Sequence, residues 1–165
     1  MFYGLTQLGV IHTAISLIAV AAGLIALIRD KEISPRNTLG KVYLTTTVLV
    51  CLTGFGIFQH GGFGKPHVLG IITLVVLGVA YVAGYTQLYG RASPYIETLS
   101  YSATFLFHLI PGITETTTRL PLGAPLLPNP EAPALQAATA VLGVLFLIGA
   151  ALQVRRLRAR LRPAS

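Results

Sequence analysis

The chain has 165 residues and a mean hydropathy of +0.72; 53% of its residues are hydrophobic and only 10% are charged. Soluble domains carry roughly 25% charged residues, so this composition excludes a soluble enzyme and a disordered chain. The net charge of +7 does not indicate a nucleic-acid binder, because the twelve basic residues are spread between apolar runs. Cys51 is the single cysteine, which excludes a disulfide framework and a cysteine-based metal site. The length is that of one domain.

Four apolar segments are long enough to cross the ~30 Å hydrocarbon core of a membrane, which requires about 20 residues. They are predicted at about 5–28, 42–59, 67–89 and 134–154. The first is not a typical signal peptide, because it lacks a basic start and its apolar run is too long. In addition, Arg29 stands where a small-residue cleavage site would lie.

A fifth segment, 95–113, is apolar enough to span but carries Glu97 and His108. If it spans and the N-terminus lies outside, ten Lys and Arg residues lie inside and only Lys65 and Arg119 lie outside. If it does not span, the basic residues divide six against six. Because Lys and Arg favour the cytoplasmic side, the pattern predicts an all-α integral membrane helical bundle of five transmembrane helices. Four helices with a re-entrant segment are the alternative.

Residues 1–154 are therefore expected to form the transmembrane bundle, with the C-terminus in the cytoplasm. Residues 155–165 contain five arginines and are expected to form a basic cytoplasmic tail that binds anionic headgroups. The connection 114–133 contains five prolines. It is expected to be an extended chain over the outer end of the bundle.

The fifth segment carries a stripe of polar residues. Residues three, four, seven and eleven apart share one face of a helix, which places Glu97, Tyr101, Thr104 and His108 together. Polar side chains in a membrane usually face the protein interior, so this stripe is expected to face the bundle. Glu97 is expected to be a neutralised or interfacial carboxylate near the cytoplasmic end, and the alternative is that the stripe forms a proton path toward an outer redox site.

The other histidines are each expected on the packing face of their helix, beside small residues that allow close helix approach. The predicted rows are His12 with Ser16, Ala19 and Gly23; His60 with Gly56, Thr53 and Thr46; and His67 with Gly70, Gly78 and Tyr81.

In the five-helix topology all four histidines lie in the outer half of the membrane. Histidines from several helices that face one core are how helical bundles hold metals and haem. The predicted metal ligands are His12, His60, His67, His108 and Glu115, for copper, iron or zinc. For a haem b, Arg119 and Lys65 are the predicted propionate partners.

Simpler interpretations are that His60 and His67 lie at the interface, and that His12 and His108 hydrogen-bond each other, Ser16 or Thr104.

The stretch 9–84 resembles the small uncharacterised multi-pass membrane proteins of bacteria. The features that carry the resemblance are IHTAISLIAVAAGLIALI, the polar loop into LGKVYLTTTVLV, and a short hairpin before another apolar span. This resemblance implies a place in the bacterial inner membrane and no particular activity. A looser resemblance is to the four-helix haem b membrane cytochromes, whose haem histidines are commonly found on both membrane sides, unlike those here.

The sequence therefore predicts an inner-membrane bundle that binds a transition metal or haem b near the periplasmic face, for electron transfer or metal handling. Its partners would be the lipid bilayer and a redox partner or larger membrane complex, with no nucleic acid. The alternative is a non-catalytic accessory subunit or a small permease in which the histidines serve packing or line the pathway.

Overall fold

The computed structural model describes residues 6–58 and 62–162, which form five α-helices and one short 3-10 helix and no strand. The elements in chain order are α1 (Gln7–Arg29), α2 (Thr38–Gly54), α3 (Lys65–Thr86), η1 (Gly90–Ala92), α4 (Ser93–Arg119) and α5 (Pro133–Arg160). The predicted all-α class and the number of helices are confirmed.

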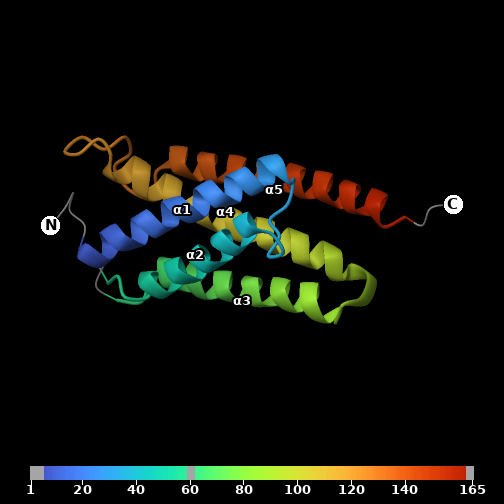
Figure 1. Ribbon diagram of the computed structural model, residues 1–165. Helices are drawn as coiled ribbons and strands as arrows, with labels where there is room; N and C mark the ends of the chain where they lie inside the picture. Colours follow the sequence, from blue (N-terminus) through green and yellow to red (C-terminus); the bar gives the residue numbers. More distant parts are fainter. Residues whose placement is uncertain (1–5, 59–61, 163–165) are drawn as a thin grey trace.

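Successive helices run in opposite directions, so their connections alternate between the two ends of the bundle (Figure 1). We call one end the basic end: it holds the α1–α2 and α3–α4 connections and the last turns of α5. Ten of the twelve Lys and Arg residues lie there. The opposite end holds Lys65 and Arg119.

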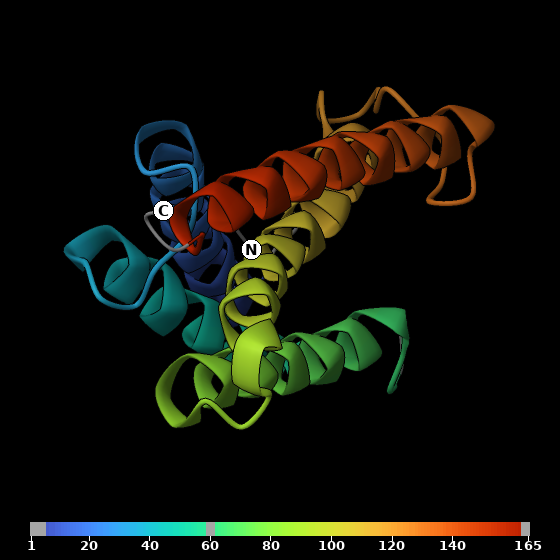
Figure 2. The same ribbon diagram turned by 90° about the vertical axis from the view of Figure 1, so that its right-hand side faces the viewer.

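Helix α4 is central, because it packs against α3 on one side and α5 on the other and also touches α1 (Figure 2). Helices α1 and α2 form a second, tightly packed pair.

The outward faces of the helices are apolar. Helices α1, α3 and α5 are long and apolar enough to cross a membrane, whereas α2 is a shorter apolar helix. Large aliphatic side chains such as Leu17, Val75 and Leu147 are more than half exposed. A soluble protein rarely exposes so continuous an apolar surface, so the chain is suited to a lipid bilayer.

Small residues let α1 approach its neighbours closely, as predicted for the row that contains His12. Ala19 and Gly23 are buried on this face, together with Ala22 and Ala26. A β-carbon at Gly23 would lie 2.7 Å from the Phe105 ring and 2.9 Å from the Tyr43 ring. Gly23 therefore allows α1, α2 and α4 to meet around two large aromatic side chains.

The predicted row on α3 is wrong in its second half. His67 is buried, but Gly78 and Tyr81 are exposed. The buried positions are instead Thr73, Leu77, Ala80 and Ala83, because the face that packs against α4 lies one residue back from the predicted one.

Helix boundaries also differ from the predicted spans. Helix α4 continues through Pro111 to Arg119 instead of ending at residue 113. Pro111 lacks the backbone donor that would bond to the Phe107 carbonyl, yet the backbone beyond it remains helical. The Thr114 hydroxyl donates to the Ile110 carbonyl within this continuation. Helix α5 continues to Arg160, so most of the predicted basic tail is a helical extension of the last span.

The predicted proline-rich connection is correspondingly shorter. Its Leu127 backbone donates to the Thr117 carbonyl, so the chain folds back along the end of α4.

The α1–α2 connection is hydrogen-bonded to α5 at the basic end. Its carbonyls at Asp30 and Lys31 accept hydrogen bonds from Arg156 (2.6 Å) and Gln153 (2.9 Å) of α5. The hydrogen bond from Arg29 lowers the pKa of the Asp30 carboxyl below its usual value, and the Asn37 amide acts in the same direction. One short loop thus connects helices that are distant in sequence.

Candidate functional site

A series of polar side chains lies in the interior of the bundle, on α4, on the facing side of α2 and on the first half of α1. We call it the polar row. Its members, from the basic end outward, are Glu97, Tyr101, Tyr43, Thr104, Thr47, His108, Thr53 and His12. The predicted polar stripe on α4 faces the bundle, since Tyr101, Thr104 and His108 are buried.

The middle of the polar row is a hydrogen-bonded group of four side chains from α2 and α4. The Tyr43 hydroxyl and the Thr104 hydroxyl are 2.8 Å apart, and the Thr47 hydroxyl lies 3.0 Å from Nε2 of His108. The Tyr43 hydroxyl also interacts with Thr47, one turn away on the same helix. The edge of one ring meets the face of the other between Tyr43 and His108, with centroids 5.9 Å apart. These contacts fix the His108 ring in an interior position.

His12 continues the polar row toward the opposite end. Its Nδ1 lies 3.0 Å from the hydroxyl of Thr53, one and a half turns beyond Thr47 on α2. The two imidazoles are close enough to interact electrostatically, and Glu115 is also close enough to interact with His12, with the opposite sign. Glu115 itself forms an ion pair with Arg119, one turn further along α4.

Glu97 begins the polar row at the basic end. Its side chain is 13% exposed and pairs with Arg36 at 2.5 Å, and the second Arg36 nitrogen donates to the Gly84 carbonyl at 2.9 Å. The hydrogen bond to Glu97 raises the pKa of Arg36, which therefore stays charged. A β-carbon at Gly84 would overlap the Glu97 carboxylate, so Glu97 holds this position only next to a glycine and any larger residue would displace it.

A pocket of about 160 Å³ opens beside Glu97 at the basic end. It is lined by both sides of two ion pairs, Arg36 with Glu97 and Arg160 with Glu32. A polar pocket of this size admits several water molecules. Glu97 therefore has a route to the aqueous side.

Tyr101 lies between Glu97 and the hydrogen-bonded group. The residue is fully buried, and its hydroxyl has no hydrogen-bond partner within residues 6–58 and 62–162. It interacts electrostatically with Glu97 and Arg36. A buried hydroxyl without a partner costs free energy, so a functional reason for this position is expected.

His67 has a different role from His12 and His108. Its Nδ1 accepts a hydrogen bond from the Gly64 backbone (3.2 Å) and thereby caps the start of α3. The ring also stacks on Phe58 and Phe63, with centroids 5.0 and 5.2 Å away. Since Nδ1 is the acceptor, the neutral ring carries its proton on Nε2, which is buried without a partner in the described part of the chain.

The remaining predicted site residues are placed as follows. His60 lies outside the described residues. Lys65 is 95% exposed and faces Glu131 at 3.9 Å. Within the described ranges, no group of three or more His, Cys, Asp or Glu residues lies close enough to hold a metal ion. The metal or haem site therefore stays a prediction.

Sequence reasoning did not identify the partners of the two interior histidines. The expected partners were the other histidine, Ser16 or Thr104, whereas in the structure His108 pairs with Thr47 and His12 pairs with Thr53. The Ser16 hydroxyl instead donates to the backbone of its own helix. The spacing of α2 could have indicated Thr47. The buried face of this helix is formed by residues three or four apart, Gly40, Tyr43, Thr47 and Cys51.

No protein-family model matches the sequence, and comparison with curated proteins and with solved structures finds no similar protein.

Proposed function

We propose that this chain is a five-span protein of the bacterial inner membrane whose polar row transfers protons between the cytoplasmic side and the outer half of the bilayer. The observation that carries the proposal is the polar row itself. It places three hydrogen-bonded pairs between Glu97 at the basic end and the opposite end of the bundle: Tyr43 with Thr104, Thr47 with His108, and Thr53 with His12. The Tyr101 hydroxyl lies between Glu97 and these pairs without a hydrogen-bond partner in the described part of the chain. Ionisable residues inside a membrane are costly and are typical of proton relays.

Both ends of the polar row support this proposal. Each ends near a carboxylate that is paired with an arginine: Glu97 with Arg36 at the basic end, and Glu115 with Arg119 at the other. A carboxylate at each boundary can exchange protons with water, and the imidazoles between them can carry a proton inside the bilayer. The unpartnered Tyr101 hydroxyl lies where Glu97 would pass its proton inward.

The direction of the polar row follows from the distribution of charge. Ten of the twelve Lys and Arg residues lie at the basic end, and basic residues are retained on the cytoplasmic side of bacterial membranes. Glu97 would then face the cytoplasm, and His12 and His108 would lie toward the periplasm.

The proposal is tested by proton flux in reconstituted vesicles. Purified protein is placed in liposomes that contain a pH-sensitive dye, and a potassium diffusion potential is applied. We expect proton flux above that of empty liposomes. We expect Glu97→Gln to abolish this flux, because the glutamine oxygen can still accept the Arg36 hydrogen bond but the amide cannot take up or release a proton. Glu32→Gln is the matched control, since Glu32 lines the same pocket and pairs with Arg160 but is not in the polar row. Equal fluxes for both variants and wild type would refute the proposal.

The topology is tested separately with single cysteines in a Cys51→Ala background. Ala124 lies in the connection at the opposite end, and Ala92 lies in the connection at the basic end. We expect a membrane-impermeant thiol reagent to label Ala124→Cys in intact cells, and to label Ala92→Cys only after the cells are opened. Labelling of Ala92→Cys in intact cells would show that the orientation is reversed.

The predicted metal or haem b site is the second candidate, with electron transfer or metal handling as its function. It is favoured by the imidazoles of His12 and His108, which lie close enough to interact electrostatically. The described residues contain no group of three His, Cys, Asp or Glu residues close enough to hold a metal ion, so further ligands would have to come from elsewhere. The same preparation, analysed for metals and by oxidised-minus-reduced absorption, decides between the two. Stoichiometric metal or a Soret band that disappears in a His108→Ala variant would favour the cofactor.

A further inference from the structure

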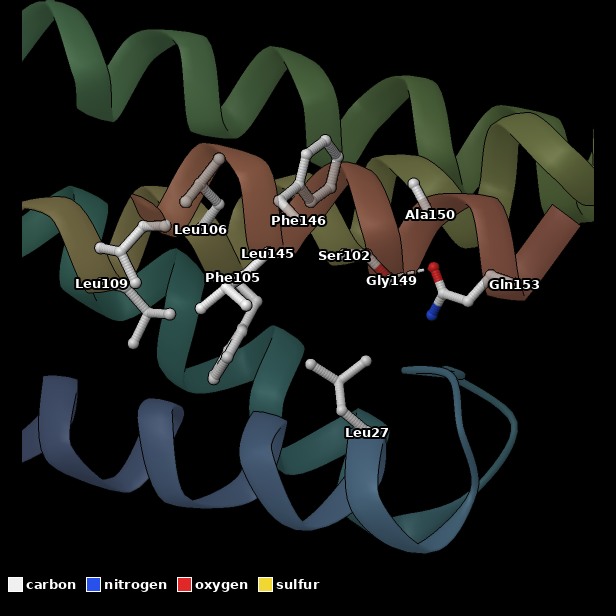
Figure 3. A pocket seen from close by; sticks show the side chains of 11 residues that line it. Leu27, Ser102, Phe105, Leu106, Leu109, Leu145, Phe146, Gly149, Ala150 and Gln153 are labelled. Atoms are coloured by element: carbon white, nitrogen blue, oxygen red, sulfur yellow. Dashed lines mark hydrogen bonds between the residues drawn. The ribbon is translucent and has the colours of Figure 1, made fainter. Parts of the chain in front are cut away.

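A groove runs along the outside of the bundle between α1 and α5. These two helices do not pack against each other over the described residues, although both contact α4. The groove that remains has a volume of about 180 Å³. Its floor is formed by Phe105, Leu106 and Leu109 of α4, and its walls by Leu27 of α1 and by α5 (Figure 3).

The lining of the groove is apolar except at the basic end. There Gln153 closes it: its side chain accepts a hydrogen bond from Ser102 (2.9 Å) and donates to the Lys31 carbonyl. Figure 3 places Gln153 and Ser102 together at one end, with Leu106 and Leu109 at the other. An apolar cavity of about 150 Å³ is large enough to bind benzene, so this groove has room for part of a hydrocarbon chain.

Positive charge lies at the closed end of the groove. Arg156 follows Gln153 by one turn on the same side of α5. One nitrogen of its guanidinium donates to the backbone carbonyl of Asp30, so the remaining N–H groups of the guanidinium stay available. The Lys31 backbone lies at the same end, since its carbonyl accepts the Gln153 hydrogen bond. The Lys31 ammonium group donates to the Ile28 carbonyl at 2.6 Å and has two further hydrogens to donate. The basic end as a whole has far more basic than acidic residues. A ligand with an apolar chain and an anionic group matches this arrangement.

We infer that the groove binds one acyl chain of an anionic phospholipid, whose phosphate lies against Arg156 and Lys31. The phosphate accepts hydrogen bonds from the guanidinium, and the chain covers Phe105, Leu106 and Leu109. This inference depends on the bilayer placement of the protein but not on proton transfer. The lipid would fill the space between α1 and α5 and hold the two helices at their observed separation.

The apolar part of the site is tested by filling the groove. Gly149 lines it, and a β-carbon at this position would meet no atom within 4 Å, so a side chain can be introduced here and leucine is expected to extend into the groove. Gly143 is the matched control, because it lies on the same helix, is equally free of contacts and does not line the groove. Full-length protein is purified in mild detergent, phosphatidylglycerol is added, and bound lipid is counted by native mass spectrometry.

We expect Gly149→Leu to lower phosphatidylglycerol occupancy by about tenfold, because the leucine side chain occupies the space of the acyl chain and removes its packing contacts with the groove. Gly143→Leu should bind like wild type. Equal lipid retention by the two variants would overturn the inference. A lipid-free protein that binds a second copy of itself through this face in wild type, but not in Gly149→Leu, would also overturn it.

The headgroup part is tested by charge. Arg156→Gln is expected to reduce the preference for phosphatidylglycerol over phosphatidylcholine, because glutamine can still donate to Asp30 but carries no positive charge. Arg158→Gln removes the same charge from the same turn at an exposed position and should leave that preference unchanged. If wild type binds the two lipids equally, the anionic site is refuted, whatever the result of the proton-flux measurement.

Discussion

Replacing His108 with glutamine is expected to lower proton flux through the reconstituted protein by about a hundredfold, the scale on which a single proton-transfer group contributes. The glutamine amide can still bond to the Thr47 hydroxyl, so the contact between α2 and α4 persists. What the variant loses is a side chain that takes up and releases a proton. The measurement is the dye-based flux under a fixed potassium diffusion potential.

The control for this variant is His67→Gln. His67 is also a buried histidine, but it caps α3 and stacks on two phenylalanines outside the polar row. Its replacement should leave flux per folded molecule unchanged, even where it lowers stability. If His108→Gln conducts protons like wild type, or if both variants lose flux equally, His108 is not a proton carrier.

The largest loss of stability is expected from Gly40→Ala. A β-carbon at Gly40 would collide with the backbone carbonyl of Ser34, and a backbone atom cannot move aside as a flexible side chain can. The α1–α2 connection would have to shift, and its carbonyl bonds to Gln153 and Arg156 would be strained or lost. Overpacking together with one or two lost hydrogen bonds corresponds to about 3 kcal/mol in the free energy of unfolding.

Unfolding in mixed micelles with increasing denaturing detergent measures this loss. Gly78→Ala is the control of opposite sign: Gly78 lies within α3, and a β-carbon there would meet nothing within 4 Å. Alanine is favoured over glycine inside a helix by up to about 1 kcal/mol, so this variant should be as stable as wild type or more so. A Gly40→Ala variant that unfolds at the wild-type detergent concentration would disprove the packing role of Gly40.

Much of the architecture was predictable, because membrane helices are encoded by composition and periodicity. Apolar runs identified the helices, and the spacing of Tyr101, Thr104 and His108 identified the inward side of α4. The count of basic residues predicted the same end for the α1–α2 and α3–α4 connections, an arrangement visible in Figure 1. These features depend on local sequence and need no knowledge of which helices are neighbours.

Features that depend on neighbours were less predictable. The threonine partners of His12 and His108 lie on α2, and the choice of Thr47 over Thr45 or Thr46 depends on the rotation of that helix against α4. The predicted span ended at residue 113, two residues after Pro111. The threonine-rich segment after it continues the helix to Arg119, with its hydroxyls bonded to preceding carbonyls.

The polarity of α4 also has a consequence for how the protein is made. Unlike α1, α3 and α5, α4 does not meet the apolarity expected of a membrane-crossing helix, so a ribosome-bound chain would gain little by releasing α4 alone into lipid. The hydroxyls that satisfy its inward side belong to Tyr43 and Thr47, which are synthesised earlier. In the proposed five-span topology we therefore expect α4 to insert together with α3 against the α1–α2 pair, and the more apolar α5 to insert last.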